Sequence, residues 1–142
     1  MSTVKSSAEL IKQIKRILSK GGFSSFIMRD VQLLSVENGK CLAKFQVGKD
    51  HVNMFSGLHG GFTASLLDNI TTYALMSKGS HPGVSVDLKV SYLKSAKEGD
   101  TVIVDANTVR AGKNLAYIEC ELRHEKDGSV IAKGGQTKFV NM

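Results

Sequence analysis

Several features are scarce or absent in this chain of 142 residues, and each absence argues against a class of protein. Only two cysteines occur, Cys41 and Cys120, without a Cys-x-x-Cys spacing, which argues against a disulfide framework or a zinc site. No apolar run approaches the roughly 20 residues that a membrane-spanning helix requires. The sequence shows no internal repeat and no long apolar region of a secretory signal. We therefore expect one domain over residues 1–142, with reduced and buried thiols, in the cytoplasm or the mitochondrion.

Familiar catalytic and cofactor motifs are also missing. The sequence contains no Gly-x-Ser-x-Gly elbow and no phosphate-binding loop, which argues against a serine hydrolase or a nucleotidase. The four histidines show no metal-ligand spacing among themselves or with carboxylates. We predict neither a metal nor a separate cofactor.

The charge of the chain is positive. Its formal net charge of +6 predicts an anionic partner. Nucleic acid is not favoured, because no zinc finger, aromatic-rich basic strand or dense basic helix occurs. A phosphate-bearing small molecule such as a coenzyme A thioester fits this moderate basic excess.

The first 22 residues combine basic and apolar side chains at helical spacing. The pattern predicts an amphipathic helix over residues 7–18. A mitochondrial presequence would have similar amphipathicity, but this segment has little arginine. We interpret it as a terminal helix that packs on the domain. The apolar stripe consists of Leu10, Ile11, Ile14, Ile17 and Leu18.

The rest of the chain predicts one helix and several strands. Apolar residues at helical spacing predict a helix from Phe62 to about Lys78, covered by protein on most sides. Alternation of apolar and polar residues predicts strands on both sides of it, and residues 84–92 resemble a half-buried strand. The sum is an α+β domain, in which a long antiparallel sheet wraps around one central helix. The expected strands cover residues 31–36, 40–47, 84–92, 101–110, 116–122 and 130–140.

The most informative segment leads into that central helix. His59, Gly60 and Gly61 precede it, and Asp68 is a lone carboxylate within it. The N–H groups at a helix start are unpaired donors that can polarise a carbonyl, and a carboxylate among apolar residues is costly unless it is used. These are the parts of an acyl-transfer site without a serine or cysteine nucleophile.

The spacing of these parts also predicts an assembly. Gly60 and Asp68 are eight residues apart, roughly 12 Å along one helix. Within one subunit, Gly60 and Asp68 cannot act on the same thioester, because the base and the oxyanion donor must each lie about 3 Å from the reacting group. A two-fold dimer would bring Gly60 of one subunit beside Asp68 of the other.

With this layout and motif spacing, the chain resembles the hotdog-fold acyl-CoA thioesterases over most of its length. One departure is Ser95, where relatives usually carry proline. The resemblance implies a hotdog fold and a homo-oligomer, at least a dimer and usually a tetramer. The segments that carry it are Leu58-His59-Gly60-Gly61, Leu67-Asp68-Asn69, Gly83-Val84-Ser85-Val86-Asp87, Tyr92-Leu93 and Ala96-Lys97.

The resemblance also implies roles for single residues. Asp68 would activate water or attack the thioester, and the Gly60 N–H would polarise its carbonyl. Asn53 would hold the carboxylate, the water or the substrate, and Ser85 would orient the water. His59 would hold the local backbone rather than act as the base. Candidate partners of the coenzyme A phosphates are Lys94, Lys97, Arg110 and Lys113.

Two other functions remain open from the sequence. A hotdog dehydratase or hydratase acting on acyl thioesters would use His59 as its base. A non-catalytic acyl-CoA-binding module would have the same fold without turnover. The length and type of the acyl group, medium, long or aryl, are not determined by the sequence.

Overall fold

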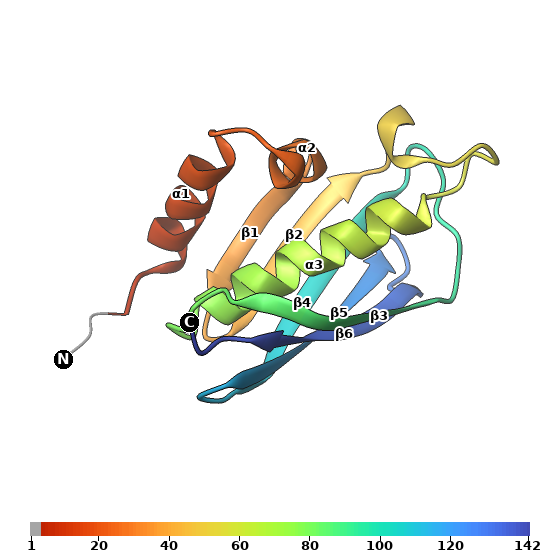
Figure 1. The fold of residues 1–142 in the computed structure, drawn as a ribbon. Coiled ribbons are helices and arrows are strands. Elements are labelled where there is room, and N and C mark those ends of the chain that lie inside the picture. Colours follow the sequence, from red (N-terminus) through yellow and green to blue (C-terminus); the bar gives the residue numbers. More distant parts are fainter. Residues whose placement is uncertain (1–3) are drawn as a thin grey trace.

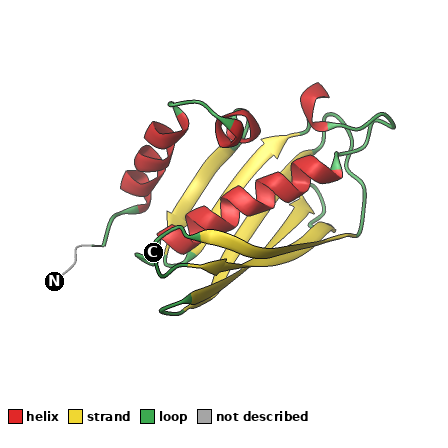
Figure 2. Cartoon of the chain, in the orientation of Figure 1, coloured by secondary structure: helices red, strands yellow, loops and turns green. Residues whose placement is uncertain are grey.

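A computed structural model describes residues 4–142 and shows six strands packed on one long helix (Figures 1 and 2). The expected segment 1–22 begins with three residues that lie outside this described part. In chain order the elements are α1 (Ser7–Leu18), α2 (Phe23–Met28), β1 (Gln32–Glu37), β2 (Lys40–Gln46), the short 3-10 helix η1 (Lys49–His51), α3 (Gly60–Met76), β3 (Val84–Tyr92), β4 (Thr101–Ala111), β5 (Leu115–His124) and β6 (Val130–Phe139).

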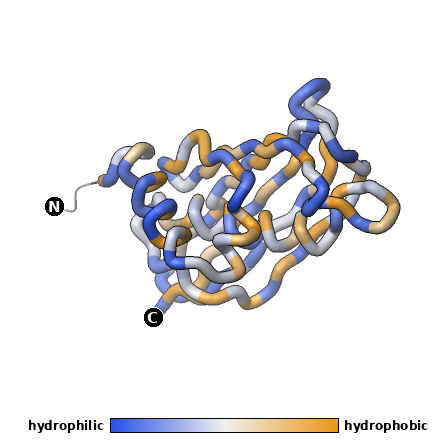
Figure 3. The backbone as a smooth tube through the Cα atoms, turned by 90° about the horizontal axis from the view of Figure 1, so that it is seen from above, coloured by the Kyte–Doolittle hydropathy of each residue, from blue (hydrophilic) through white to orange (hydrophobic). Residues whose placement is uncertain are grey.

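The six strands form one antiparallel sheet in the order β1-β2-β4-β5-β6-β3. In Figure 1, α3 lies along one face of this sheet, while α1 and α2 lie beside β1. Hydrophobic and hydrophilic stretches alternate repeatedly along the chain (Figure 3), as expected where one sheet face packs on a core. The predicted α+β architecture with a central helix is confirmed.

Helix α3 contributes more buried apolar side chains to the core of the described residues than any other element. His59 caps its N-terminus, and the helix runs from Gly60 to Met76, two residues earlier at each end than the sequence predicts. Leu66, Leu67 and Ile70 are fully buried, which matches the expected coverage on most sides. Consecutive buried residues such as Leu66 and Leu67 point in different directions around a helix, so protein contacts α3 on more than one side.

Helix α1 has the predicted bounds and packs on the domain. Leu10 and Ile14 are buried, and the Val36 N–H donates a hydrogen bond of 2.9 Å to the Ser7 hydroxyl. This contact attaches the start of α1 to β1. The short helix α2 was not predicted, because its six residues give too few turns for a periodic signal.

Strand β3 corrects one expectation. It is an edge strand, and residues 84–89 are exposed in the single chain, whereas the sequence predicted a half-buried strand. A β-bulge lies at Val86, because Ser85 pairs with Lys138 whereas Asp87 pairs with the adjacent Thr137. An extra residue reverses the alternation of side chains between the two faces. Before the bulge Ser85 faces α3.

After the bulge the even-numbered residues of β3 face α3. Leu88 pairs with Gln136, and Tyr92 pairs with Ala132, both on the helix side of β6. The bulge therefore lets one strand present both Ser85 and Tyr92 to the central helix.

The two cysteines are buried and free, as expected. Both pair with Ala106 of β4, from opposite sides, so two strand spacings separate them. That separation, roughly 10 Å, is too long for a disulfide. Burial raises the pKa of the Cys41 thiol to about 12.

Candidate active site

Asp68 lies in the middle of α3, and two other elements reach its carboxylate. Its Oδ1 accepts a hydrogen bond of 2.9 Å from the Gln136 side chain on β6, and the Ser85 hydroxyl on β3 lies 3.4 Å away. Within residues 4–142 no hydrogen bond reaches Oδ2. The described residues therefore hold the carboxylate through one of its two oxygens.

A buried lysine lies close to this carboxylate. Lys138 is 4% exposed, and its ammonium group donates to the Thr72 hydroxyl at 2.9 Å. Burial lowers the pKa of Lys138, and the charge of Asp68 partly opposes that shift. The Asp68 region therefore contains a cation that offsets part of the negative charge.

Asp68, Ser85 and Lys138 line one cavity of about 360 Å³. Its remaining wall is mostly apolar and comes from α1 and the end of α3. Ile14, Ile17, Tyr73 and Met76 are among the lining residues. A group of polar and charged side chains is thus joined to an apolar space.

The other end of α3 carries the glycine motif. The Gly61 N–H donates to Nδ1 of His59 at 2.8 Å, so His59 is the cap of the helix. No hydrogen bond occupies the Gly60 N–H among the described residues. The Tyr92 hydroxyl donates to the Gly60 carbonyl at 2.6 Å, which attaches the first turn of α3 to the end of β3. The motif therefore offers one free N–H at a fixed position.

Asn53 organises the loop before this motif. Its Oδ1 accepts the N–H groups of Phe55 at 2.9 Å and Gly57 at 3.1 Å. Within one chain it does not reach Asp68 by a hydrogen bond. Met54 and Phe55, in the same loop, are 88% and 84% exposed.

The four candidate cations divide between the two ends of the sheet. Lys94 lines a cavity of about 430 Å³ together with Gly60 and Tyr92. Lys97 pairs through an isolated bridge with Gly57, in the same region. Arg110 and Lys113 lie at the β4–β5 turn, and β5 begins opposite Phe139, which also pairs with the start of β3. One chain does not bring the four together.

Three functional candidates were misjudged or missed by the sequence reasoning. His51, which the sequence does not single out, is 4% exposed and stacks on Phe62 at 4.4 Å between ring centroids. Gln136 and Lys138 were not considered. Their signal was available, because the even-numbered residues near the chain end are otherwise small or apolar, and a polar residue at such a position faces the core.

Comparison with known proteins identifies the family. The family model described as "Thioesterase superfamily" matches residues 55–131. The chain is 33% identical over 136 residues to acyl-coenzyme A thioesterase 13 of Homo sapiens, covering 95% of this chain and 97% of that protein. It belongs to the thioesterase superfamily.

Solved structures agree with this assignment. The crystal structure of zebrafish thioesterase superfamily member 2 superimposes with a TM-score of 0.86 at 35% identity, covering 92% of this chain and 95% of that chain. A Streptococcus mutans protein solved bound to acetyl CoA has a TM-score of 0.74 at 26% identity, covering 78% of this chain and 87% of that one. The hotdog fold expected from the sequence is confirmed, and the chain is a homologue of thioester hydrolases.

Two kinds of feature are absent from the described residues. No group of three or more His, Cys, Asp or Glu side chains suited to a metal ion occurs within residues 4–142. Over the same residues, no helix combines the length and hydrophobicity needed to cross a membrane.

Proposed function

We propose that this thioesterase hydrolyses acyl-CoA, with Asp68 as general base. The observation that carries the proposal is the Asp68 carboxylate, fixed by Gln136 through Oδ1 and free at Oδ2, in a cavity with an apolar wall. A water on Oδ2 would attack the thioester carbon and give its proton to Asp68. Collapse of the tetrahedral intermediate would break the C–S bond, and the coenzyme A thiolate would take up that proton. Free acid and coenzyme A result.

The oxyanion of that intermediate needs a donor that Asp68's own subunit does not provide nearby. Strand β3 supports a solution, because its Ser85 end lies at Asp68 and its Tyr92 end at Gly60. A two-fold axis pairs edge strands antiparallel, so Tyr92 and Gly60 of the partner subunit would come beside Ser85 and Asp68. The Gly60 N–H of one subunit would then polarise the thioester held by Asp68 of the other.

Exposed apolar side chains at this edge also support a dimer. Val84, Val86 and Leu88 on β3 are 51%, 59% and 40% exposed. An unpaired edge strand with such side chains readily pairs with another copy. Met54 and Phe55, exposed in the loop that precedes Gly60, would lie at the same interface. A tetramer would be a pair of such dimers.

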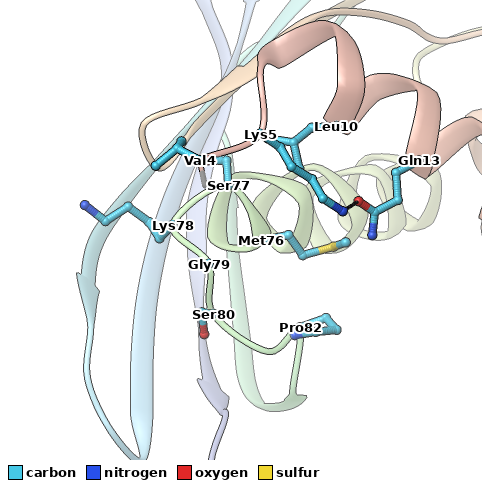
Figure 4. A pocket seen from close by; sticks show the side chains of 10 residues that line it. All are labelled: Val4, Lys5, Leu10, Gln13, Met76, Ser77, Lys78, Gly79, Ser80 and Pro82. Carbon is cyan, nitrogen blue, oxygen red and sulfur yellow. Dashed lines mark hydrogen bonds between the residues drawn. The ribbon is translucent and has the colours of Figure 1, made fainter. Parts of the chain in front are cut away.

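The cavity wall supports a medium- or long-chain or aryl acyl group. Met76 and Pro82 line both the Asp68 cavity and a second cavity of about 360 Å³ between α1 and the end of α3. In Figure 4, Met76 lies between the α1 side chains and Pro82 in this second cavity. An acyl group extending from Asp68 along the apolar wall of the first cavity would reach Met76, where the two cavities meet.

The four candidate cations suit the coenzyme A part of the substrate. In the two-fold dimer, Lys94 and Lys97 of the partner subunit would lie at the same end as Asp68, together with Arg110 and Lys113 of its own subunit. Their charges would attract the coenzyme A phosphates to the mouth of the site. The relative bound to acetyl CoA supports this choice of ligand.

The test is thiol release from a panel of acyl-CoAs, short to long and aryl, by the wild type, Asp68→Asn and the control Asp105→Asn. We expect turnover by the wild type and the control, and a loss of about 100-fold or more in Asp68→Asn. Acyl-CoA binding without thiol release would instead indicate a binding module or a dehydratase. Hydration of an enoyl-CoA, monitored by the loss of its ultraviolet absorbance, separates those two.

A further inference from the structure

Gln136 is a fully buried amide beside the reactive carboxylate. It lies on β6 with 0% exposure and faces α3. A buried amide costs folding free energy unless its donors and acceptor are all satisfied. Every polar atom of this side chain has a partner, and those partners belong to the site.

The partners of Gln136 fix which way its amide points. Its Nε2 lies 2.6 Å from the Thr71 hydroxyl, and the single hydrogen of that hydroxyl is directed to the carbonyls of Leu67 and Asp68 at 2.7 and 3.1 Å. Thr71 therefore accepts from Gln136. The second Nε2 hydrogen is directed to Asp68, whose Oδ1 lies 2.9 Å and whose carbonyl oxygen lies 3.1 Å away. These neighbours of Nε2 all act as acceptors, so the –NH₂ group must be on this side.

The orientation of the Gln136 amide determines where the hydroxyl hydrogen of Ser85 is directed. With Nε2 directed to α3, Oε1 faces Ser85, whose hydroxyl donates to it at 2.6 Å. The same hydroxyl is 3.4 Å from Asp68 Oδ1, so the contact with Gln136 is the stronger one. The Ser85 hydrogen is thereby directed to Gln136, and its lone pairs remain for a molecule in the cavity.

We propose that Gln136 is a positioning residue that makes Ser85 a hydrogen-bond acceptor for the attacking water. This inference rests on the proposed role of Asp68 as general base. The water donates one hydrogen to Asp68 Oδ2 and the other to Ser85, and its lone pair is then directed away from both, toward the thioester carbon. Without Gln136, the Ser85 hydroxyl turns to Asp68 and competes with the water for the carboxylate.

A neutral amide performs this task equally at all pH values at which the enzyme works. Gln136→Glu has nearly the same shape but titrates. When its new carboxyl group is protonated, this variant can donate to Asp68 and accept from Ser85 as the amide does; when that group is ionised, it repels Asp68 and cannot donate. The charged or titratable groups that face Asp68 are Lys138 on β6 and Tyr73 on α3, and both are present in every variant.

The test compares kcat and KM for acyl-CoA hydrolysis between pH 5 and 9 in the wild type, Gln136→Glu and Gln136→Met. Gln46→Met is the matched control, because Gln46 is exposed on β2 and makes one 3.3 Å contact with Gly99. We expect Gln136→Met to lower kcat by about 10- to 100-fold with little change in KM. The kcat of Gln136→Glu relative to the wild type should fall steadily as the pH rises.

A purely structural role predicts different results. It would give Gln136→Glu a pH profile parallel to that of the wild type. A Gln136→Met enzyme with kcat within about twofold of the control would also overturn the inference. In an Asp68→Asn background, the added Gln136→Met change should lower kcat by less than about threefold, because both residues act on the same water. If Asp68→Asn itself keeps wild-type turnover, the proposed function fails first, whatever Gln136 does.

Discussion

The Tyr92 hydroxyl donates a 2.6 Å hydrogen bond to the carbonyl oxygen of Gly60. This contact joins the last residue of the edge strand to the first residue of the central helix. In the proposed dimer it would hold the oxyanion donor at the place where the partner's Asp68 needs it.

Tyr92→Phe should therefore weaken both the fold and the chemistry. We expect a loss of about 1 kcal/mol in the free energy of unfolding, because one partly exposed hydrogen bond disappears. Because the Gly60 N–H is no longer fixed, kcat should fall by several-fold. Denaturant titration and thiol release measure the two effects. Tyr117→Phe, an exposed tyrosine on β5, should change neither.

Gly60→Pro tests the N–H of Gly60 directly. Gly60 is the first residue of α3, where proline is accepted, and His59 has the extended backbone that a following proline requires. We expect the helix to start as before and turnover to fall by about 100-fold. Gly60→Ala is the matched control: it adds a Cβ, which would lie 3.3 Å from the Tyr92 ring, but keeps the N–H. Equal losses in both variants would point to crowding instead of the lost donor.

Mixing two inactive variants tests whether the site is shared between subunits. A dimer of one Asp68→Asn chain and one Gly60→Pro chain contains one site in which both residues are intact. Equal amounts, unfolded and refolded together, should recover about a quarter of wild-type activity, since half of the dimers are mixed and each has one active site. A mixture that stays inactive, although mass spectrometry detects mixed dimers, would contradict the two-fold arrangement.

The binding position of the acyl group can be tested with a substitution at Met76. Because Met76 lines both cavities, Met76→Trp should fill the space where they meet. We expect kcat/KM to fall by at least about tenfold for long-chain acyl-CoA. Acetyl-CoA, which is too short to reach this region, is the internal control and should be hydrolysed at an unchanged rate. A uniform loss for all chain lengths would place the acyl group elsewhere.

The stability of the domain should depend on pH through His51. Burial lowers the pKa of His51 below its ordinary value of 6.5, although Asp30 and Asp50 partly oppose the shift. As the pH falls below about 6.5, the unfolded chain binds a proton that the folded protein binds only at lower pH. The free energy of unfolding should therefore decrease from pH 7 to pH 5. His51→Gln should flatten this dependence, whereas His81→Gln, at an exposed position, should keep it.

The parts of this structure that the sequence predicts are those with a local pattern. The bounds of α1 follow from its apolar stripe, and Asp68 stands out as the lone carboxylate of an apolar helix. His51 could not be placed in this way, because it is buried between Phe45 and Phe62, which come from different elements. Ser85 was selected through family resemblance alone. The alternation along β3 gives no sign of the bulge that turns Ser85 toward α3.

The extra residue in β3 also means that the length of this strand matters as much as its composition. The side chain of Val86 is 59% exposed, so many substitutions there should be harmless. Deleting the residue would restore plain alternation and leave Ser85 and Leu88 on the same face of the sheet, because they would then lie two positions apart. A homologue shortened by one residue at the bulge would therefore keep Ser85 and Tyr92 on the helix side, whereas a one-residue gap between Leu88 and Tyr92, with the bulge retained, would turn Tyr92 away from Gly60. Gaps beyond the bulge, more than substitutions, should therefore distinguish sequences that preserve the reaction from those that preserve only the architecture.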